Sequence, residues 1–307
     1  MNKLLLKILI FLLPILIFVI VLFSNNYDRN FAYHYIKDDC YNHGAWIYSR
    51  IFENKKPIDI AFFGSSETLH AVNDKQIEDT LKQTGFNENC VNFGYCRFGN
   101  NLYLTFLTDL IENKKPKIIL IEVREFENNY SHPIFPFLAN NKEILNEPLI
   151  FNKDYFSDLY KAIVSRYDLL RSKILKTNNI YNYDSSNFGY ANSSIIADSS
   201  TLIFKQIKTT ENYWHNLELK FPEKYYQEIF NLCEKQNIKL CFYYIPSFSY
   251  PISAPTEIEI YKKYGIVLIP PKEIFKNHKN YIDENHLNDN GSKLYSDWLS
   301  GELTNLL

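Results

Sequence analysis

The stretch "PIDIAFFGSSETLH", residues 57–70, begins as an apolar run and ends as a polar turn. Its apolar part, residues 58–64, predicts a buried strand. Gly64 then permits a sharp turn, and two serines and a glutamate follow at once. In an open α/β sheet, ligands gather beyond the carboxyl ends of the strands. The stretch therefore raises the question whether Ser66 is part of an ordinary turn or a nucleophile.

Further apolar runs alternate with amphipathic segments along the chain. The apolar runs predict strands at residues 90–94, 116–123, 238–246 and 266–270. The amphipathic segments predict helices at residues 73–85, 100–115, 223–237, 255–265 and 288–307. Strands separated by helices form βαβ units. We therefore expect an α/β domain with a three-layer, flavodoxin-like parallel sheet of about five strands.

The N-terminus predicts a membrane anchor. Residues 4–23 hold a single charge, Lys7, and their length matches the roughly 20 residues that cross a bilayer as a helix. Lys3 and Lys7 favour a cytoplasmic N-terminus, which places the rest of the chain outside the cytoplasm. A cleaved signal peptide is the alternative, but the run ends "VLFSNNYD" without a small-residue cleavage site.

Three regions follow from these patterns. Residues 1–24 form the anchor, residues 25–56 an aromatic connection expected to be helical, and residues 57–307 the α/β domain. Within that domain, residues 128–215 are rich in Asn, Ser and Tyr and interrupt the alternation. We expect them to be a mostly helical and irregular insertion, with a helix at 154–175, that forms a lid or a docking surface.

Composition excludes some classes of function. The 307 residues carry a net charge of −2, so no nucleic-acid partner is expected. The five cysteines lack CxxC spacing, which argues against a disulfide framework but leaves one bridge open. Cys40 and His43 have C-x-x-H spacing without a second pair of ligands, so no metal site is expected. No motif indicates a cofactor.

The segment "YIDENHLNDNG" near the C-terminus places Asp283 three residues before His286. Serine needs a base to become a nucleophile at neutral pH, and imidazole suits that task when a carboxylate fixes its tautomer. Asp283 and His286 are thus candidates to activate Ser66. The alternative is a capping loop in which both side chains satisfy backbone groups. His70 and Glu67 are weaker candidates, because a helix is expected to carry His70 away and Glu67 to cap amides or face solvent.

Together, "FGSSE", "NFGYCRFGNN" and "DENHLN" resemble the motif blocks of the SGNH (GDSL-like) hydrolase superfamily. The resemblance implies that Ser66 is the nucleophile, with Ser65 in the place of the usual aspartate. It implies that His286 and Asp283 complete a catalytic triad. The N–H groups of Ser66 and of a glycine in the second block would form the oxyanion hole; Gly99 fits that glycine best and Gly94 second best.

One block of the superfamily is missing. Gly-x-Asn-Asp is expected after the third strand, but the chain reads "IEVREFE" there. Loss of one oxyanion donor typically lowers the rate by about 10²–10³. Arg124, Asn100 and Asn101 are candidates to replace the absent asparagine. A membrane-anchored subset, which includes the D-alanine transfer protein and the alginate O-acetylation proteins, resembles the chain more closely because it also has Gly-Ser-Ser and lacks this block.

The expected function is therefore an extracytoplasmic serine acyl esterase or O-acyltransferase that acts on a cell-envelope glycan or polymer. A transferase would need a membrane partner, such as a multipass acyltransferase, to deliver acyl groups. The alternative is a non-catalytic protein of the same fold that binds a glycan or a membrane partner. The missing third block favours this alternative, whereas the set of Ser66, His286 and Asp283 favours the enzyme.

Overall fold

A computed structural model describes residues 2–24, 28–36, 43–145, 152–175, 186–200, 202, 213–248 and 252–307. Its centre is a five-stranded, all-parallel sheet with the strand order β2-β1-β3-β4-β5. The strands are β1 (Ile60–Gly64), β2 (Cys90–Gly94), β3 (Ile118–Val123), β4 (Lys239–Tyr244) and β5 (Ile266–Leu268). The expectation of an α/β domain with a parallel sheet of about five strands is confirmed.

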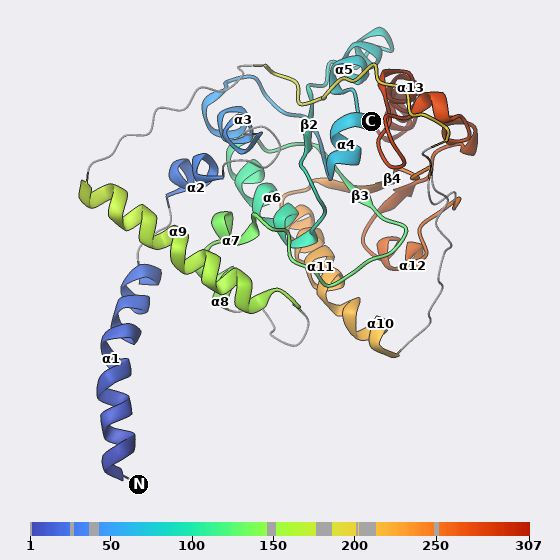
Figure 1. Cartoon of the computed structure of the whole chain (residues 1–307). Coiled ribbons are helices and arrows are strands. Elements are labelled where there is room, and N and C mark those ends of the chain that lie inside the picture. Colours follow the sequence, from blue (N-terminus) through green and yellow to red (C-terminus); the bar gives the residue numbers. More distant parts are fainter. Residues whose placement is uncertain are drawn as a thin grey trace.

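Helices connect the strands and lie on both faces of the sheet (Figure 1). One face packs against α6 (Asn100–Lys114) and α11 (Lys220–Lys235). The other face packs against α4 (Ser66–Ala71), α5 (Asp74–Gln83) and α13 (Asp289–Leu306). Successive residues of β1 alternate between the two cores, with Phe63 in the first and Phe62 in the second. Burial on both faces explains why the strands are continuously apolar.

Two neighbouring strands position the start of α4. Gly64 of β1 is in register with Gly94 of β2, and its carbonyl accepts from the N–H of Tyr95 at 2.9 Å. On its other side, β1 pairs with β3, which ends in Glu122 and Val123. The chain order reverses between β1 and β3, and ligands of open α/β sheets bind at such a point. The turn after Gly64 thus begins at the carboxyl edge expected for a site.

Some predicted helices differ in length from the structure. The helix expected at residues 255–265 is only the single turn α12 (Ile258–Tyr261). Gly265 lies against the backbone of β4, where an added Cβ would be 2.5 Å from the carbonyl oxygen of Leu240. This close approach leads the chain into β5, so the helix ends early. The short 3-10 turns Lys272–Phe275 and His278–Asn280 precede α13.

The N-terminal helix α1 (Asn2–Ser24) projects from the domain (Figure 1). Within the described residues it is the one helix that is long and apolar enough to cross a membrane. The connection is mostly helical where it is described, as expected, and residues 25–27 and 37–42 lie outside the described part. Its elements are α2 (Arg29–Tyr35), α3 (His43–Tyr48) and a π-helical turn (Ser49–Glu53).

Within the described part of residues 128–215, three helices precede an extended segment. These are α7 (Phe135–Leu138), α8 (Asn141–Leu145) and α9 (Tyr155–Leu175), which matches the helix expected at 154–175. Residues 186–200 then lie against the domain, where the N–H of Ala191 donates to the carbonyl of Leu69 at 3.0 Å. The region closes with α10 (Tyr213–Glu218), directly before α11. The extended part is therefore packed into the fold.

Candidate active site

Ser66 is the first residue of α4, directly after the turn that ends β1. The hydroxyl of Ser65 caps the helix by accepting from the N–H of Glu67 at 3.0 Å. Capping by serine is favoured at this position because it satisfies an otherwise unpaired N–H. The local sequence therefore places the hydroxyl of Ser66 at the carboxyl edge of the sheet.

Ser66, His286 and Asp283 form a continuous chain of contacts. Ser66 Oγ lies 2.7 Å from His286 Nε2, within hydrogen-bonding distance of a general base. His286 Nδ1 lies 2.8 Å from Asp283 Oδ2. Because Asp283 accepts from Nδ1, Nε2 is left free to take the serine proton. The side chains of His286 and Asp283 are 23% and 50% exposed, so solvent reaches the site.

The loop that carries Asp283 and His286 holds its carboxylate in place. Asp283 Oδ1 accepts from the backbone N–H groups of Asn285 and His286 at 2.8 and 2.9 Å. Burial alone would raise the pKa of Asp283, but the contacts with His286 and these N–H groups lower it to about 2. Ser247 supports the loop from the end of β4 by donating to the carbonyl of Glu284 at 2.8 Å. Asp283 therefore both caps its own loop and orients the imidazole.

Glu122, near the end of β3, lies beneath the serine turn. Its carboxylate accepts from the N–H of Ser65 at 2.7 Å, from the hydroxyl of Ser65 at 2.9 Å and from the hydroxyl of Thr68. The hydroxyl of Tyr243, on β4, lies 2.6 Å from the hydroxyl of the same threonine. Burial raises the pKa of Glu122 against the opposing effect of these hydrogen bonds. Sequence reasoning missed this residue, although a glutamate at the last but one position of an otherwise apolar strand is a usable signal.

The candidate oxyanion donors differ in their availability. The N–H groups of Ser66 and Gly99 have no acceptor within the part of the chain that the structure describes. The N–H of Gly94, in contrast, donates to Asn92 Oδ1 at 2.8 Å. Gly99 lies against His132, where an added Cβ would be 2.4 Å from the Cβ of that histidine. Of the two glycines considered from sequence, Gly99 thus keeps an unengaged donor.

The asparagines considered as substitutes for the missing block are engaged elsewhere. Asn100 Nδ2 donates to Glu127 at 3.0 Å, and Asn101 Nδ2 donates to Ser131 at 2.6 Å. Both asparagine side chains are buried. The structure therefore brings neither amide to the serine turn, because polar partners in the core hold them.

Arg124 and Glu67 lie in a cluster of charges behind the turn. The guanidinium of Arg124 stacks over the ring of Phe98 at 4.5 Å. Burial opposes its charge, but Glu67 and neighbouring carboxylates raise the pKa of Arg124 overall. Burial and the charge of Glu122 raise the pKa of Glu67 well above its usual value. Ser65, and not Glu67, caps the helix, and the side chain of Glu67 is partly exposed.

His70 lies beside the triad, contrary to the expectation that a helix would carry it away. Its ring centroid is 5.5 Å from that of His286, in an edge-to-face arrangement. Its Nδ1 donates to the carbonyl of Ala191 at 2.8 Å. Burial and the proximity of His286 lower the pKa of His70. His70 follows Ser66 by four residues within α4, so the two side chains lie on the same face of the helix one turn apart, and His70 packs against His286.

The cysteines and His43 show no grouping for a metal. The described residues contain no group of three or more potential metal ligands. His43 stacks on Trp46 with ring centroids 4.7 Å apart, and Cys40 lies outside the described residues. Cys96 is disulfide-bonded. The thiols of Cys90, Cys233 and Cys241 are free and buried.

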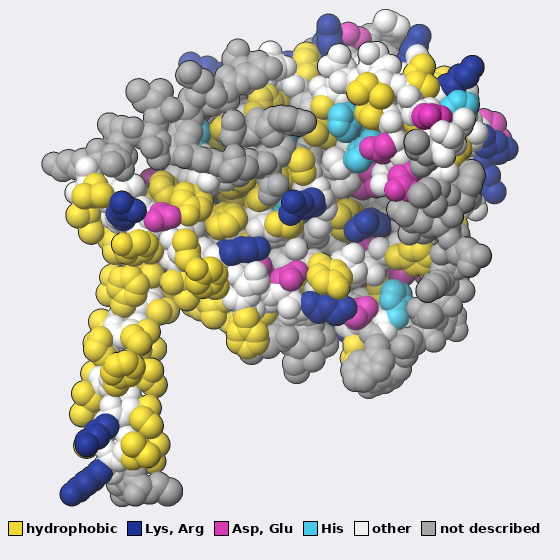
Figure 2. All heavy atoms as spheres, in the orientation of Figure 1, with side chains coloured by type: hydrophobic (Ala, Val, Ile, Leu, Met, Phe, Trp, Pro, Cys, Tyr) yellow, Lys and Arg dark blue, Asp and Glu magenta, His cyan; other side chains and the backbone are white. Residues whose placement is uncertain are grey.

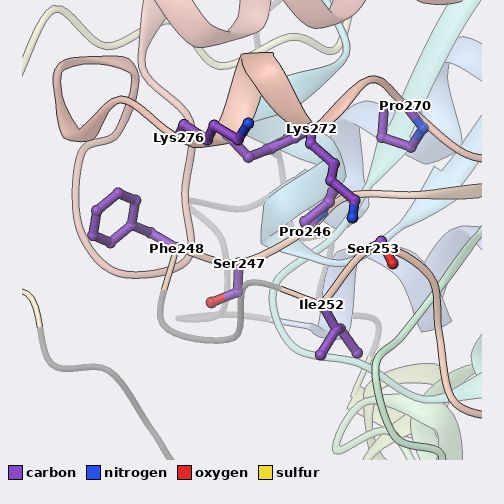
Figure 3. A pocket seen from close by; sticks show the side chains of 9 residues that line it. Pro246, Ser247, Phe248, Ile252, Ser253, Pro270, Lys272 and Lys276 are labelled. Atoms are coloured by element: carbon purple, nitrogen blue, oxygen red, sulfur yellow. The ribbon is translucent and has the colours of Figure 1, made fainter.

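A cavity of about 230 Å³ lies next to the loop that carries Asp283 and His286 (Figure 3). Its walls include Ser247, which contacts that loop, and Phe248, whose ring packs on Tyr281 at 5.3 Å. Lys272 and Lys276 lie at its rim. The cavity is smaller than the roughly 300–1,000 Å³ typical of pockets for drug-sized ligands. The cavity can hold a small chemical group. Separately, histidine and acidic side chains gather on the open surface over α4 (Figure 2).

Comparison with known proteins adds no assignment. No family model matches the sequence, and no curated protein matches it significantly. The function is therefore inferred from the geometry of this site.

Proposed function

We propose that the chain is an extracytoplasmic serine acyl-transfer enzyme, an esterase or an O-acyltransferase, acting on an acylated cell-envelope glycan or polymer. The observation that carries the proposal is the contact chain from Ser66 Oγ through His286 to Asp283, with distances of 2.7 and 2.8 Å. A nucleophile, a base and a group that orients the base are the parts that acyl transfer by serine requires.

In the first step, Ser66 Oγ attacks the ester carbonyl carbon while its proton passes to His286 Nε2. Ionised Asp283 accepts the Nδ1–H and stabilises the imidazolium. The N–H groups of Ser66 and Gly99 donate to the carbonyl oxygen as it becomes negative. The imidazolium then gives its proton to the leaving alkoxide as the ester C–O bond breaks, which leaves an acyl group on Ser66.

In the second step, water or a glycan hydroxyl attacks the acyl-serine while His286 takes a proton from it. The bond between the acyl carbon and Ser66 Oγ breaks, and His286 returns the proton to the serine. Water yields a carboxylic acid, and a glycan hydroxyl yields a new ester. Acetyl-CoA is absent outside the cytoplasm, so a transferase depends on a membrane partner, such as a multipass acyltransferase, for its acyl groups.

The proposal also covers the fold family and the cellular location of the chain. Helices on both faces of a parallel sheet with the order 2-1-3-4-5 fit a three-layer, SGNH-like domain. Helix α1 would be its uncleaved anchor, with Lys3 and Lys7 on the cytoplasmic side. The disulfide of Cys96 supports an oxidising location, since disulfides persist mainly outside the cytoplasm.

Labelling of the full chain in detergent with a fluorophosphonate probe tests the nucleophile. We expect wild type to be labelled, Ser66→Ala to be unlabelled and His286→Ala to react far more slowly. Ser157→Ala, which removes an exposed serine on α9 outside the cavity, serves as the matched control and should react like wild type. The proposal is wrong if folded wild type reacts no more than Ser66→Ala.

The competing proposal is a non-catalytic envelope protein that binds a glycan or a membrane partner. It is favoured by one observation, the burial of Asn100 and Asn101 in other contacts, which keeps these two amides from replacing the missing donor. Absent labelling together with measurable binding of an envelope polysaccharide would support this second function.

A further inference from the structure

Helix α9 exposes apolar side chains on the side that faces away from the domain. Phe156, Tyr160, Tyr167 and Ile174 are 76%, 68%, 46% and 70% exposed. With 3.6 residues per turn, their spacing places them within about 40° around the helix axis. The buried residues of α9 lie on the opposite side and are Asp158, Ala162, Ser165, Arg166 and Leu169. A helix on a water-facing surface has the reverse pattern, so the outer stripe indicates a contact surface.

The inward side of α9 is fixed by polar contacts. Arg166 Nε donates to Asn141 Oδ1 at 2.9 Å, and Arg166 Nη2 donates to the carbonyl of Ala139 at 3.0 Å. The same guanidinium lies 4.6 Å from the ring of Phe23, near the end of α1. These contacts fix the orientation of α9 about its own axis, and its apolar stripe therefore faces outward.

The carboxyl end of α1 is built into the same cluster. Asn141 Nδ2 donates to the carbonyl of Phe23 at 2.5 Å, and Leu22 is buried. Further along α1, the ring of Phe18 lies 6.3 Å from that of Tyr167. Helix α9 crosses this end of α1 (Figure 1), and the apolar surface of α1 continues onto α9 (Figure 2). The position of α1 in a bilayer thus determines the position of α9.

The contact between Phe18 and Tyr167 sets the depth of α9. Phe18 lies six residues before the end of α1 at Ser24, or about 9 Å along the helix. Interfacial amphipathic helices sit about 5–10 Å deep at the boundary of headgroups and acyl chains. Tyrosine is enriched at this level, and Arg171, which is exposed next to the stripe on α9, suits lipid phosphates.

We infer that the outer face of α9 lies in the phospholipid interface of the bilayer that α1 crosses. The contact holds the domain against the membrane at a second point, so the domain does not swing freely on its anchor. The inference rests on α1 as an anchor and is independent of the serine chemistry.

Quenching of tryptophan fluorescence by brominated lipids tests this contact. The full chain is placed in nanodiscs of phosphatidylcholine and phosphatidylglycerol, with or without acyl chains brominated near the glycerol end. Tyr160→Trp places a reporter on the outer face of α9. The emission of the native tryptophans is measured on the wild-type chain and subtracted. We expect about a twofold loss of the added emission in brominated discs.

Leu294→Trp is the matched control, because Leu294 is an exposed apolar residue, 46% accessible, on the remote helix α13. Its emission should not change in brominated discs. Circular dichroism verifies folding, and retention after carbonate extraction of vesicles verifies the anchor. Quenching of Tyr160→Trp no greater than that of Leu294→Trp would overturn the inference. A finding that a membrane protein, and not lipid, covers the outer face of α9 would also overturn it. Loss of α1 from the bilayer would overturn it as well.

Discussion

The carboxylate of Glu122 accepts hydrogen bonds from both the backbone N–H and the hydroxyl of Ser65, at 2.7 and 2.9 Å. The residue directly before the candidate nucleophile is therefore held from the neighbouring strand. Ser65 also caps α4, so its hydroxyl joins the helix start to the carboxylate. The SGNH resemblance leads one to expect an asparagine that contacts substrate just after β3, whereas in this chain Glu122 near the end of β3 holds the turn.

Replacing Glu122 with Gln should disturb the position of Ser66. The glutamine amide has one acceptor oxygen for the donors that now bind two carboxylate oxygens. Hydrogen bonds to charged groups contribute about 1.5–3 kcal/mol. We expect the free energy of unfolding to fall by about that amount, and the rate of fluorophosphonate labelling to fall about 10–100-fold. Urea unfolding and labelling kinetics measure the two effects. Glu228→Gln, at an exposed position on α11, should change neither. Labelling at the wild-type rate in Glu122→Gln would contradict a positioning role.

A methyl group at Gly64 should disrupt the same turn. A Cβ there would lie 1.8 Å from Thr68 Oγ1 and 2.3 Å from Glu122 Oε2. Because both groups are buried and hydrogen-bonded, we expect Gly64→Ala to lower the free energy of unfolding by about 1–3 kcal/mol or more. Gly301→Ala is the matched control on α13, where a Cβ meets no atom within 4 Å. It should be neutral or stabilise by about 0.5–1 kcal/mol. Equal stability of the two variants in thermal unfolding would argue against this packing.

The parts of the fold that depend on local pattern were predictable from sequence. Residues 90–94 form the predicted strand, since buried parallel strands are continuously apolar. Asn73 caps α5 by accepting from the N–H of Gln76, as its residue type favours. The order of the strands was not predicted, because it depends on contacts between segments far apart in the chain.

The site was predictable where a motif carries its own chemistry. Ser66, Asp283 and His286 were singled out as residue types that acyl transfer requires, and the structure brings them together. Glu122 was missed because its partner Ser65 is 57 residues away and no local signal joins the two. His70 was misplaced because a helix that starts at Ser66 keeps residue 70 on the same face one turn away, and does not carry it off.

The buried Asp74 should make stability depend on pH. Burial raises the pKa of Asp74 from 3.8 to about 6, although the N–H groups of Gly189 and Asn92 donate to it. At pH values between 3.8 and about 6, the folded chain therefore keeps a proton on Asp74 that the unfolded chain has released. The free energy of unfolding consequently falls as pH rises through this range. In Asp74→Asn this decline should be smaller by at most about 3 kcal/mol. Urea unfolding from pH 4 to 6.5 measures it, and exposed Asp79→Asn should keep the wild-type slope.

Substitution of Asp283 by Asn should impair the chemistry more than the fold. With a pKa of about 2, Asp283 is ionised throughout neutral and mildly acidic pH. Its contribution to stability is present above its unfolded pKa of about 4 and is lost as pH falls toward 2. At pH 7 an amide neither stabilises an imidazolium nor enforces the tautomer with a free Nε2. We expect labelling of Ser66 to slow by about 10²–10⁴.

Asp198→Asn is a suitable control, because Asp198 is an exposed carboxylate that likewise accepts from a backbone N–H two residues on, at 2.9 Å. A general effect of removing such a turn carboxylate would appear in both variants as a lower melting temperature without a change in labelling rate. An effect through His286 would appear in Asp283→Asn alone, as a slower reaction of a chain that melts close to wild type. If Asp283→Asn is labelled as fast as Asp198→Asn, the carboxylate only caps its loop, and His286 is oriented by other contacts.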